Sequence, residues 1–258
     1  MLKTRIIPSL LWKDFGLVKG VGFDSWRRVG PIVPAVRVYA RRDVDELLVL
    51  DIAASQKGSG PDYELVSEVA DEATVPLTVG GGVSSEDHVA RLLESGADKI
   101  VINTAAYDDL RLIERCAHRF GAQCIVLSID YRSTPSGPKC YSHSGTLATD
   151  WSPPEWARIG EESGAGEILL TSIERDGTMQ GYDVATLLSV TSAVTVPVIA
   201  SGGAGAPTDM LAAVQQGHAS AVAAASIYHF TQQTPREMRD FLRENGVPVR
   251  SSAVLADA

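Results

Sequence analysis

A single carboxylate at the end of an apolar run is the residue of this sequence best suited to acid–base chemistry. The run CIVLSID (124–130) closes on Asp130. A carboxylate next to a buried strand costs free energy unless it has a partner or a chemical task. We therefore predict that Asp130 acts as a general acid or base, with capping of a helix or loop as its alternative role.

Two pairs of adjacent glycines end similar apolar runs and are typical of anion binding. Gly81-Gly82 ends VPLTVGGG, and Gly202-Gly203 ends VPVIASGG. Glycine lets backbone N–H groups approach an anion closely, and the start of a following helix adds a favourable dipole. A second polar position follows each pair, Asn103-Thr104 after the first and Ala225-Ser226 after the second. We predict two phosphate cradles for a long substrate with a phosphate at each end; ordinary tight turns are the alternative.

Other residues near the ends of the apolar runs are candidates for contact with a ligand. Asp176 precedes Gly177 in ERDGT, an Asp-Gly pair that also favours a turn. Lys19 in VKG falls in a predicted long loop after the first strand, where a solvated lysine is the alternative. Asp51 is expected to bind substrate, to orient other groups or to cap a helix. The remaining candidates are Ser144, Thr171 and Ser201.

Strand-like and helix-like segments alternate along the chain. The strand-like runs are 5–11, 46–52, 77–80, 98–103, 124–130, 167–172, 197–201 and 220–225. The helical patterns fall near 33–42, 61–72, 85–95, 107–119, 153–164, 183–193, 206–216 and 234–244. Eight such units predict an α/β fold, a (β/α)8 TIM barrel whose site lies at the carboxyl ends of the strands. A doubly wound sheet is the alternative, but the first strand lacks its glycine-rich fingerprint.

The sequence also repeats itself at an offset of 121 residues. DELLVLDI resembles GEILLTSI, and VPLTVGGG resembles VPVIASGG. We predict one barrel domain over 1–250, built from tandem half-barrels of about 1–120 and 121–250, with a tail at 251–258. RIIPSLL aligns with CIVLSID at a similar offset of 119 residues, so that Leu11 aligns with Asp130. One of two symmetric carboxylates is therefore missing.

Charged residues of alternating sign stand at the opposite ends of four predicted strands. They are Arg5, Glu46, Lys99 and Glu167. Charges at strand starts usually face water, but these four are able to form a ring of salt bridges across the barrel floor. Such a ring would act as a plug, or as a gate for something small.

Composition narrows the class of protein. The 258 residues are 45% hydrophobic and 21% charged, with a net charge of −9 and no long Lys/Arg run. Nucleic acid and anionic membrane are therefore unexpected partners. No signal-type segment and no 18-residue apolar stretch is visible, so we expect a cytoplasmic protein. The three cysteines lack CxxC spacing and are expected to be reduced thiols; no metal and no cofactor are expected.

Several stretches together carry a family resemblance. They are RIIP, VKG with Phe23, DELLVLDI, VPLTVGGGV, GADKIVINTAA, SID, YSHSG, GAGEILLTSIERDGTMQGYD, VPVIASGGAG and AAASIYHF. Over residues 2 to about 250 the chain resembles the cyclase subunit of imidazole glycerol phosphate synthase, from histidine biosynthesis.

The resemblance implies a barrel with a separate glutaminase subunit on its N-terminal face. Ammonia would cross the barrel through a gate formed by Arg5, Glu46, Lys99 and Glu167. It would attack a bisphosphorylated formimino-ribulosyl carboxamide, a phosphorylated small molecule, between two catalytic aspartates. The products would be imidazole glycerol phosphate and aminoimidazole carboxamide ribotide.

The chain departs from the family pattern at its acid–base machinery. Asp130 matches one catalytic aspartate, but the family's IPCLD is IPSLL here, with Leu11 in place of the other. Gly30-Pro31-Ile32 replaces GDP, and Thr146-Leu147 replaces the usual basic residues after Ser144-Gly145. Leucine cannot transfer a proton, and a general acid or base is worth about 10²–10⁴ in rate.

A branch of the family that reads IP-x-LL fits better. We expect an ammonia-using synthase or lyase subunit of a glutamine amidotransferase complex. It would deliver ammonia to an N-acetyl sugar amidotransferase in surface polysaccharide synthesis. The alternatives are an authentic cyclase of histidine biosynthesis that tolerates Leu11, and a non-catalytic, phosphate-binding activator of a glutaminase.

Overall fold

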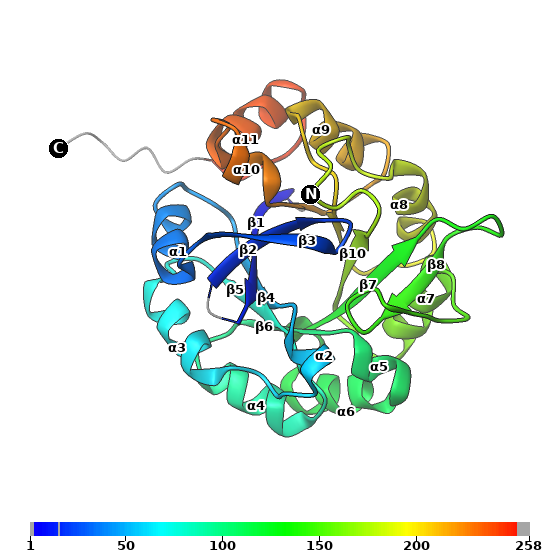
Figure 1. The fold of residues 1–258 in the computed structure, drawn as a ribbon. Helices are drawn as coiled ribbons and strands as arrows, with labels where there is room; N and C mark the ends of the chain where they lie inside the picture. Colours follow the sequence, from blue (N-terminus) through cyan, green and yellow to red (C-terminus); the bar gives the residue numbers. More distant parts are fainter. Residues whose placement is uncertain (1–2, 15, 252–258) are drawn as a thin grey trace.

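Eight parallel strands form a closed barrel in the computed structural model, which describes residues 3–14 and 16–251 (Figure 1). The barrel strands are β1 (Arg5–Lys13), β4 (Leu47–Asp51), β5 (Leu77–Gly80), β6 (Lys99–Ile102), β7 (Ile125–Arg132), β10 (Glu167–Ser172), β11 (Val198–Ser201) and β12 (Ala221–Ala224). Each pairs in parallel with the next, and β12 pairs with β1 to close the circle. The predicted (β/α)8 barrel is confirmed.

Amphipathic helices form the outer layer of the barrel. They are α1 (Ile32–Ala40), α3 (Tyr63–Glu72), α4 (Glu86–Glu94), α6 (Arg111–Phe120), α7 (Pro153–Glu162), α8 (Val184–Thr191), α9 (Pro207–Gln215) and α11 (Pro235–Glu244). Side chains of Asp62, Ser85, Asp183 and Thr234 accept backbone N–H bonds at four helix starts, as N-caps do. A large apolar core fills the space between the helices and the strands, and a smaller aliphatic core fills the barrel itself.

Short extra elements follow several barrel strands and were not predicted. They are β2 (Gly16–Val21), β3 (Asp24–Gly30), α2 (Ala54–Lys57), α5 (Thr104–Asp108), β8 (Lys139–Ser142), β9 (Leu147–Ala148) and α10 (Ser226–Phe230), and a 3₁₀ turn, η1 (Ala122–Cys124), precedes β7. The prediction of a long loop after the first strand is wrong. β1 runs on to Lys13 and pairs with β2, because Leu17 and Val18 are apolar enough to be buried against it.

The β2–β3 hairpin lies across the mouth of the barrel, as Figure 1 shows. Its turn is fixed to the loop after β10, because the Gly22 N–H donates to the carbonyl oxygen of Asp176 at 2.9 Å. Gly177 packs so closely against Gly20 that a Cβ there would collide with the Gly20 carbonyl oxygen. The hairpin therefore roofs part of the predicted site.

The predictions of two half-barrels and of a C-terminal tail stay predictions. The two half-barrels remain a prediction, and of the predicted tail at 251–258 all but Ser251 lies outside the described residues. Within the described residues, no helix has the length and apolarity needed to cross a membrane.

Candidate active site

A deep cavity opens at the carboxyl ends of the barrel strands, under the β2–β3 hairpin. It encloses about 1090 Å³ when the solvent-filled mouth is counted. The residues predicted to bind substrate all contribute to its lining. They are Lys19, Asp51, Gly81, Gly82, Asn103, Thr104, Asp130, Ser144, Thr171, Asp176, Gly177, Ser201, Gly202, Gly203, Ala225 and Ser226.

Asp130 lies on the β7 wall of this cavity and is 8% exposed. Its Oδ2 accepts a hydrogen bond of 2.8 Å from the Asn103 side-chain amide. Burial is the main cause that raises the pKa of Asp130 to about 7, and the negative charge of Asp176 adds to the rise. Hydrogen bonds from Asn103 and Thr171 oppose it. A carboxyl group with a pKa near neutrality is able both to accept and to return a proton.

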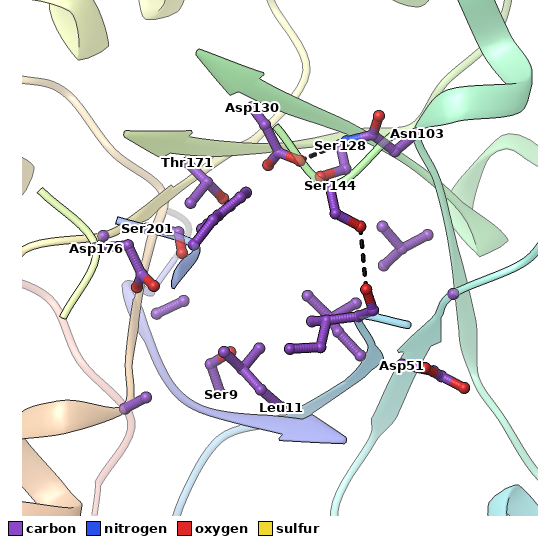
Figure 2. A pocket seen from close by; sticks show the side chains of 18 of the residues that line it. Ser9, Leu11, Asp51, Asn103, Ser128, Asp130, Ser144, Thr171, Asp176 and Ser201 are labelled. Carbon is purple, nitrogen blue, oxygen red and sulfur yellow. Dashed lines mark hydrogen bonds between the residues drawn. The ribbon is translucent and has the colours of Figure 1, made fainter. Parts of the chain in front are cut away.

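Leu11 occupies the opposite wall, on β1, and is also 8% exposed (Figure 2). It is level with Leu50 of β4 and Val18 of β2 in the strand registers. This side of the cavity is therefore aliphatic at the height where the other side carries Asp130. The internal repeat of the sequence predicted this asymmetry.

Lys19 and Asp176 form a buried ion pair inside the cavity. The Lys19 ammonium lies 2.7 Å from both carboxylate oxygens of Asp176, and Lys19 is only 3% exposed. The alternative of a solvated loop lysine does not hold: Lys19 belongs to β2, and burial of its stem in the hairpin brings its charge to the loop after β10. The pair couples the roof of the cavity to its wall.

The first glycine cradle joins the ends of β5 and β6. Gly81 and Gly82 have φ angles of 118° and 68°, a region that favours glycine. A Cβ on Gly82 would lie 2.5 Å from the carbonyl oxygen of Ser59. Helix α5 begins at Thr104 with Asn103 as its N-cap, and first-turn N–H groups have no acceptor within their helix. Asn103 and Thr104 line the same cavity as the two glycines, as an anion cradle requires.

The second cradle repeats this arrangement at the ends of β11 and β12. Gly202 and Gly203 have φ angles of 87° and 113°, and a Cβ on Gly203 would collide with the carbonyl oxygen of Gly181. Helix α10 begins at Ser226, with Ala225 as its N-cap. The Ser226 hydroxyl is buried without a hydrogen-bond partner among the described residues. A buried donor in this position suits a ligand oxygen.

Two other predicted ligand contacts, Asp51 and Ser144, already form hydrogen bonds within the protein. Asp51 is held by the turn before α2, because its Oδ1 accepts bonds of 2.8 and 3.1 Å from the N–H groups of Ala53 and Ala54. Burial raises the pKa of Asp51, and these two bonds oppose the rise. The Ser144 hydroxyl donates to the Ile52 carbonyl oxygen at 3.0 Å, which ties the 143–145 turn to the loop after β4.

Several lining residues were not identified from the sequence. Ser9 and Ser128 lie two positions before Leu11 and Asp130, so that they share the inner face of β1 and β7. That spacing, together with the repeat that aligns the two serines, was the available signal. Phe23 and Trp26 also line the cavity, but they come from the hairpin that was predicted as a loop.

A charged ring closes the opposite end of the barrel, at the amino ends of the strands. Arg5 contacts Glu46 at 2.6 Å and also pairs with Glu167, and Lys99 contacts Glu46 at 3.0 Å and Glu167 at 2.8 Å. Burial opposes the charge of Arg5, but its bonds to Glu167 and Glu46 outweigh burial and raise the pKa of the guanidinium. The four predicted residues therefore form a continuous ring of ion pairs.

The donor groups of the described residues do not favour a metal centre. No group of three or more His, Cys, Asp or Glu side chains in residues 3–14 and 16–251 is arranged to hold a metal ion. The cavity presents instead a protonatable carboxyl group, an ion pair and two glycine turns.

The protein is a (β/α)8 barrel with a buried carboxyl group and two pairs of glycines at its mouth and an ion-pair ring at its floor. Residues 5–234 match the family described as histidine biosynthesis protein, and the chain belongs to this family. It is 49% identical over 251 residues to a protein of Hyphomonas neptunium, covering 97% of this chain and all of that protein. It is 46% identical over 256 residues to a protein of Caulobacter vibrioides, covering 98% of each. Both are named imidazole glycerol phosphate synthase subunit HisF.

Proposed function

We propose that this protein is the ammonia-using, cyclase-type subunit of a glutamine amidotransferase complex of the imidazole glycerol phosphate synthase kind. The observation that carries the proposal is that the two ends of one barrel carry different polar features. Two anion cradles and Asp130 share the cavity at one end, and the charged ring closes the other. The names of the relatives support the same reaction type.

The ligand of the cavity is proposed to be a small molecule with two phosphate groups. One phosphate would be held by the N–H groups around Gly82 and Thr104, and the other by those around Gly203 and Ser226. The reacting centre would then lie between the cradles, beside Asp130. With a pKa of about 7, Asp130 would take a proton from the attacking nitrogen and return it to a leaving group.

The route for ammonia is proposed to run through the barrel from floor to mouth. Above the charged ring the interior is aliphatic, lined by Ile7, Leu48, Val101, Val126, Leu169 and Ile199. Ammonium is poorly solvated by such a lining, whereas neutral ammonia crosses it at low cost. A glutaminase subunit on the N-terminal face would supply the ammonia at the ring.

Leu11 favours a second candidate within the same class. It puts an aliphatic side chain where the family pattern has the partner of Asp130, so that one proton-transfer group is absent from the cavity wall. In this second proposal the barrel passes ammonia to a different acceptor. That acceptor would be an N-acetyl sugar held by a sugar amidotransferase in polysaccharide synthesis.

The two candidates are separated by a direct assay of the cyclase reaction. The purified protein is mixed with the bisphosphorylated formimino-ribulosyl substrate and excess ammonium salt, without a glutaminase. Formation of imidazole glycerol phosphate at an ordinary cyclase rate supports the first candidate. Tight binding of the substrate without turnover supports the second, or a non-catalytic activator of a glutaminase. If the protein neither binds the substrate nor turns it over, the whole proposal is contradicted.

A further inference from the structure

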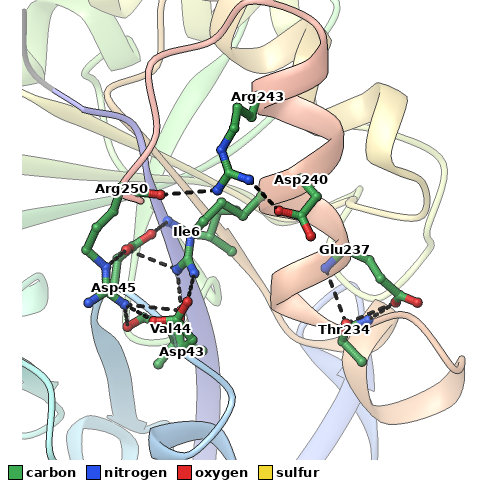
Figure 3. Close-up of polar contacts among 10 residues, drawn as sticks. Ile6, Asp43, Val44, Asp45, Thr234, Glu237, Asp240, Arg243 and Arg250 are labelled. Carbon is green, nitrogen blue, oxygen red and sulfur yellow. Dashed lines mark hydrogen bonds and ion pairs between the residues drawn. The ribbon is translucent and has the colours of Figure 1, made fainter. Parts of the chain in front are cut away.

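A second polar cluster lies against the outer edge of the barrel floor, behind the charged ring. Asp43 and Asp45, just before β4, meet Arg239 of α11 and Arg250 of the segment that follows it; we call these four residues the clamp. Figure 3 shows Arg250 reaching back to Asp43, Val44 and Asp45. The segment around Arg250 is itself joined to the start of β1, since the Thr4 N–H donates to the Pro248 carbonyl oxygen at 2.7 Å.

The contacts of the clamp are dense and charge-balanced. Arg250 Nε lies 2.9 Å from Asp45 Oδ1, and its Nη2 lies 2.6 Å from Asp43 Oδ1 and 3.1 Å from the Val44 carbonyl oxygen. Arg239 Nη1 lies 2.6 Å from Asp43 Oδ2, and its Nη2 lies 3.1 Å from Asp45 Oδ1. Arg239 is fully buried, whereas the Arg250 side chain is 43% exposed. Arg250 is thus the accessible end of the cluster.

The clamp reaches the charged ring through two adjacent peptide segments. Asp45 and Ile6 exchange two hydrogen bonds: the Ile6 N–H donates to Asp45 Oδ2 at 2.9 Å, and the Asp45 N–H donates to the Ile6 carbonyl oxygen at 3.3 Å. Arg5 precedes Ile6, and Glu46 follows Asp45. Since side chains alternate along a strand, Ile6 packs outside the barrel while Arg5 joins the ring inside.

We propose that Arg250 is a positioning residue for the charged ring. By holding Asp43 and Asp45 it fixes the register of the two segments from which Arg5 and Glu46 project. Any effect on ammonia passage rests on the proposed function, but the positioning itself does not. A partner that contacted the exposed Arg250 would therefore change the positions of Arg5 and Glu46 in the ring.

The test is amide hydrogen exchange and NMR on the full chain, which need no substrate. Arg250→Ala should speed exchange of the Ile6 amide by about tenfold or more, because Asp45 loses a charge-assisted bond. It should also broaden the guanidinium signals of Arg5. Arg250→Lys, which keeps the charge but loses the planar fork, should restore part of the protection. The Ile168 amide, next to Glu167 on β10, should not change.

Arg158→Ala is the matched control, because this arginine is 61% exposed and paired only loosely with Glu162 on α7. It should leave both the Ile6 and the Ile168 amides as they are. An unchanged Ile6 amide in Arg250→Ala would overturn the proposal. So would equal acceleration of Ile6 and Ile168, which would show global loosening. Failure of the cyclase assay alone would count against the first candidate function and leave this result intact.

Discussion

Leu11 and Asp130 face each other across the mouth of the barrel, on strands that the internal repeat of the sequence superposes. One wall of the cavity therefore keeps its proton-transfer group while the symmetric position on the other wall has become aliphatic. The consequence is measurable. Leu11→Asp should raise ammonium-dependent formation of imidazole glycerol phosphate by roughly tenfold or more, since a general acid or base is worth about 10²–10⁴ in rate.

Leu11→Asn is the control for that experiment, because asparagine restores polarity and size without a titratable proton. A gain in both variants would assign the effect to polarity. No gain in Leu11→Asp would mean that the changed segments at Gly30–Ile32 and Thr146-Leu147 also matter for the reaction.

Asp130→Asn should abolish ammonium-dependent turnover, with a loss of about 10²-fold or more. The amide keeps the volume of the carboxyl group and can still accept the bond from Asn103, so that the cavity is preserved. The rate of product formation and the affinity for substrate should be measured separately. Retained turnover would remove Asp130 from the mechanism.

The same substitution should change the pH dependence of stability. Because burial raises the pKa of Asp130 to about 7, the folded chain keeps a proton there that the unfolded chain releases above its ordinary pKa. The unfolded state thus binds fewer protons between about pH 4 and 7, so the free energy of unfolding of the wild type falls as pH rises.

Asp130→Asn has no carboxyl group to titrate at this position, so its free energy of unfolding should not show this fall. The free energy of unfolding of the variant minus that of the wild type should therefore increase across the same pH range, by up to about 4 kcal/mol. Urea unfolding at pH 4.5, 6 and 8 measures the difference. These pH values cover roughly the range between the ordinary pKa of the carboxyl group and its raised pKa in the folded protein. A constant difference between the two proteins would contradict the raised pKa.

Gly203→Ala should weaken binding at the second cradle by about tenfold or more, because the new Cβ collides with the Gly181 carbonyl oxygen and the residue has a φ of 113°. Calorimetric titration with the bisphosphorylated substrate gives the affinity, and circular dichroism checks the fold. Gly137→Ala is the control, since this glycine has a similar φ of 106°, lies outside the cavity lining and has no atom within 4 Å of its added Cβ. Equal affinities in the two variants would argue against an anion site there.

Glu167→Gln should destabilise the chain by about 2–4 kcal/mol, because its nearly buried carboxylate balances both Arg5 and Lys99. Glu162→Gln removes a carboxylate that is 69% exposed and lies 4.0 Å from Arg158, and should change stability by less than about 0.5 kcal/mol. Denaturant unfolding compares the two variants. Similar small effects would mean that the ring adds little to stability.

The barrel was predictable because its strands are buried on both faces and its helices on one. Runs such as CIVLSID are largely continuous and apolar, and glycine pairs mark the carboxyl ends of two of the runs, VPLTVGGG and VPVIASGG. Asp130, the two cradles and the charged ring followed from residues at such strand ends. The missing partner of Asp130 followed from the repeat.

The roof of the cavity was not predictable from local sequence. Lys19 looks like a surface residue until its partner is known, and that partner, Asp176, lies 157 positions away. Trp26 enters the cavity only because β3 pairs with β2. The clamp was missed for the same reason, since Asp45 and Arg250 come together only when the barrel closes.

The ring at the floor contains two positive and two negative groups, so its formal charge is zero. Each ionised group already has its counter-ion, so the ring has no net charge that would attract an approaching ion over a long distance. A cation or anion would have to displace an existing ion pair and lose its own hydration. A small uncharged molecule meets neither barrier and needs only room to pass. Under the proposed function, the floor of this barrel would act as an electroneutral filter that admits an uncharged molecule more readily than an ion.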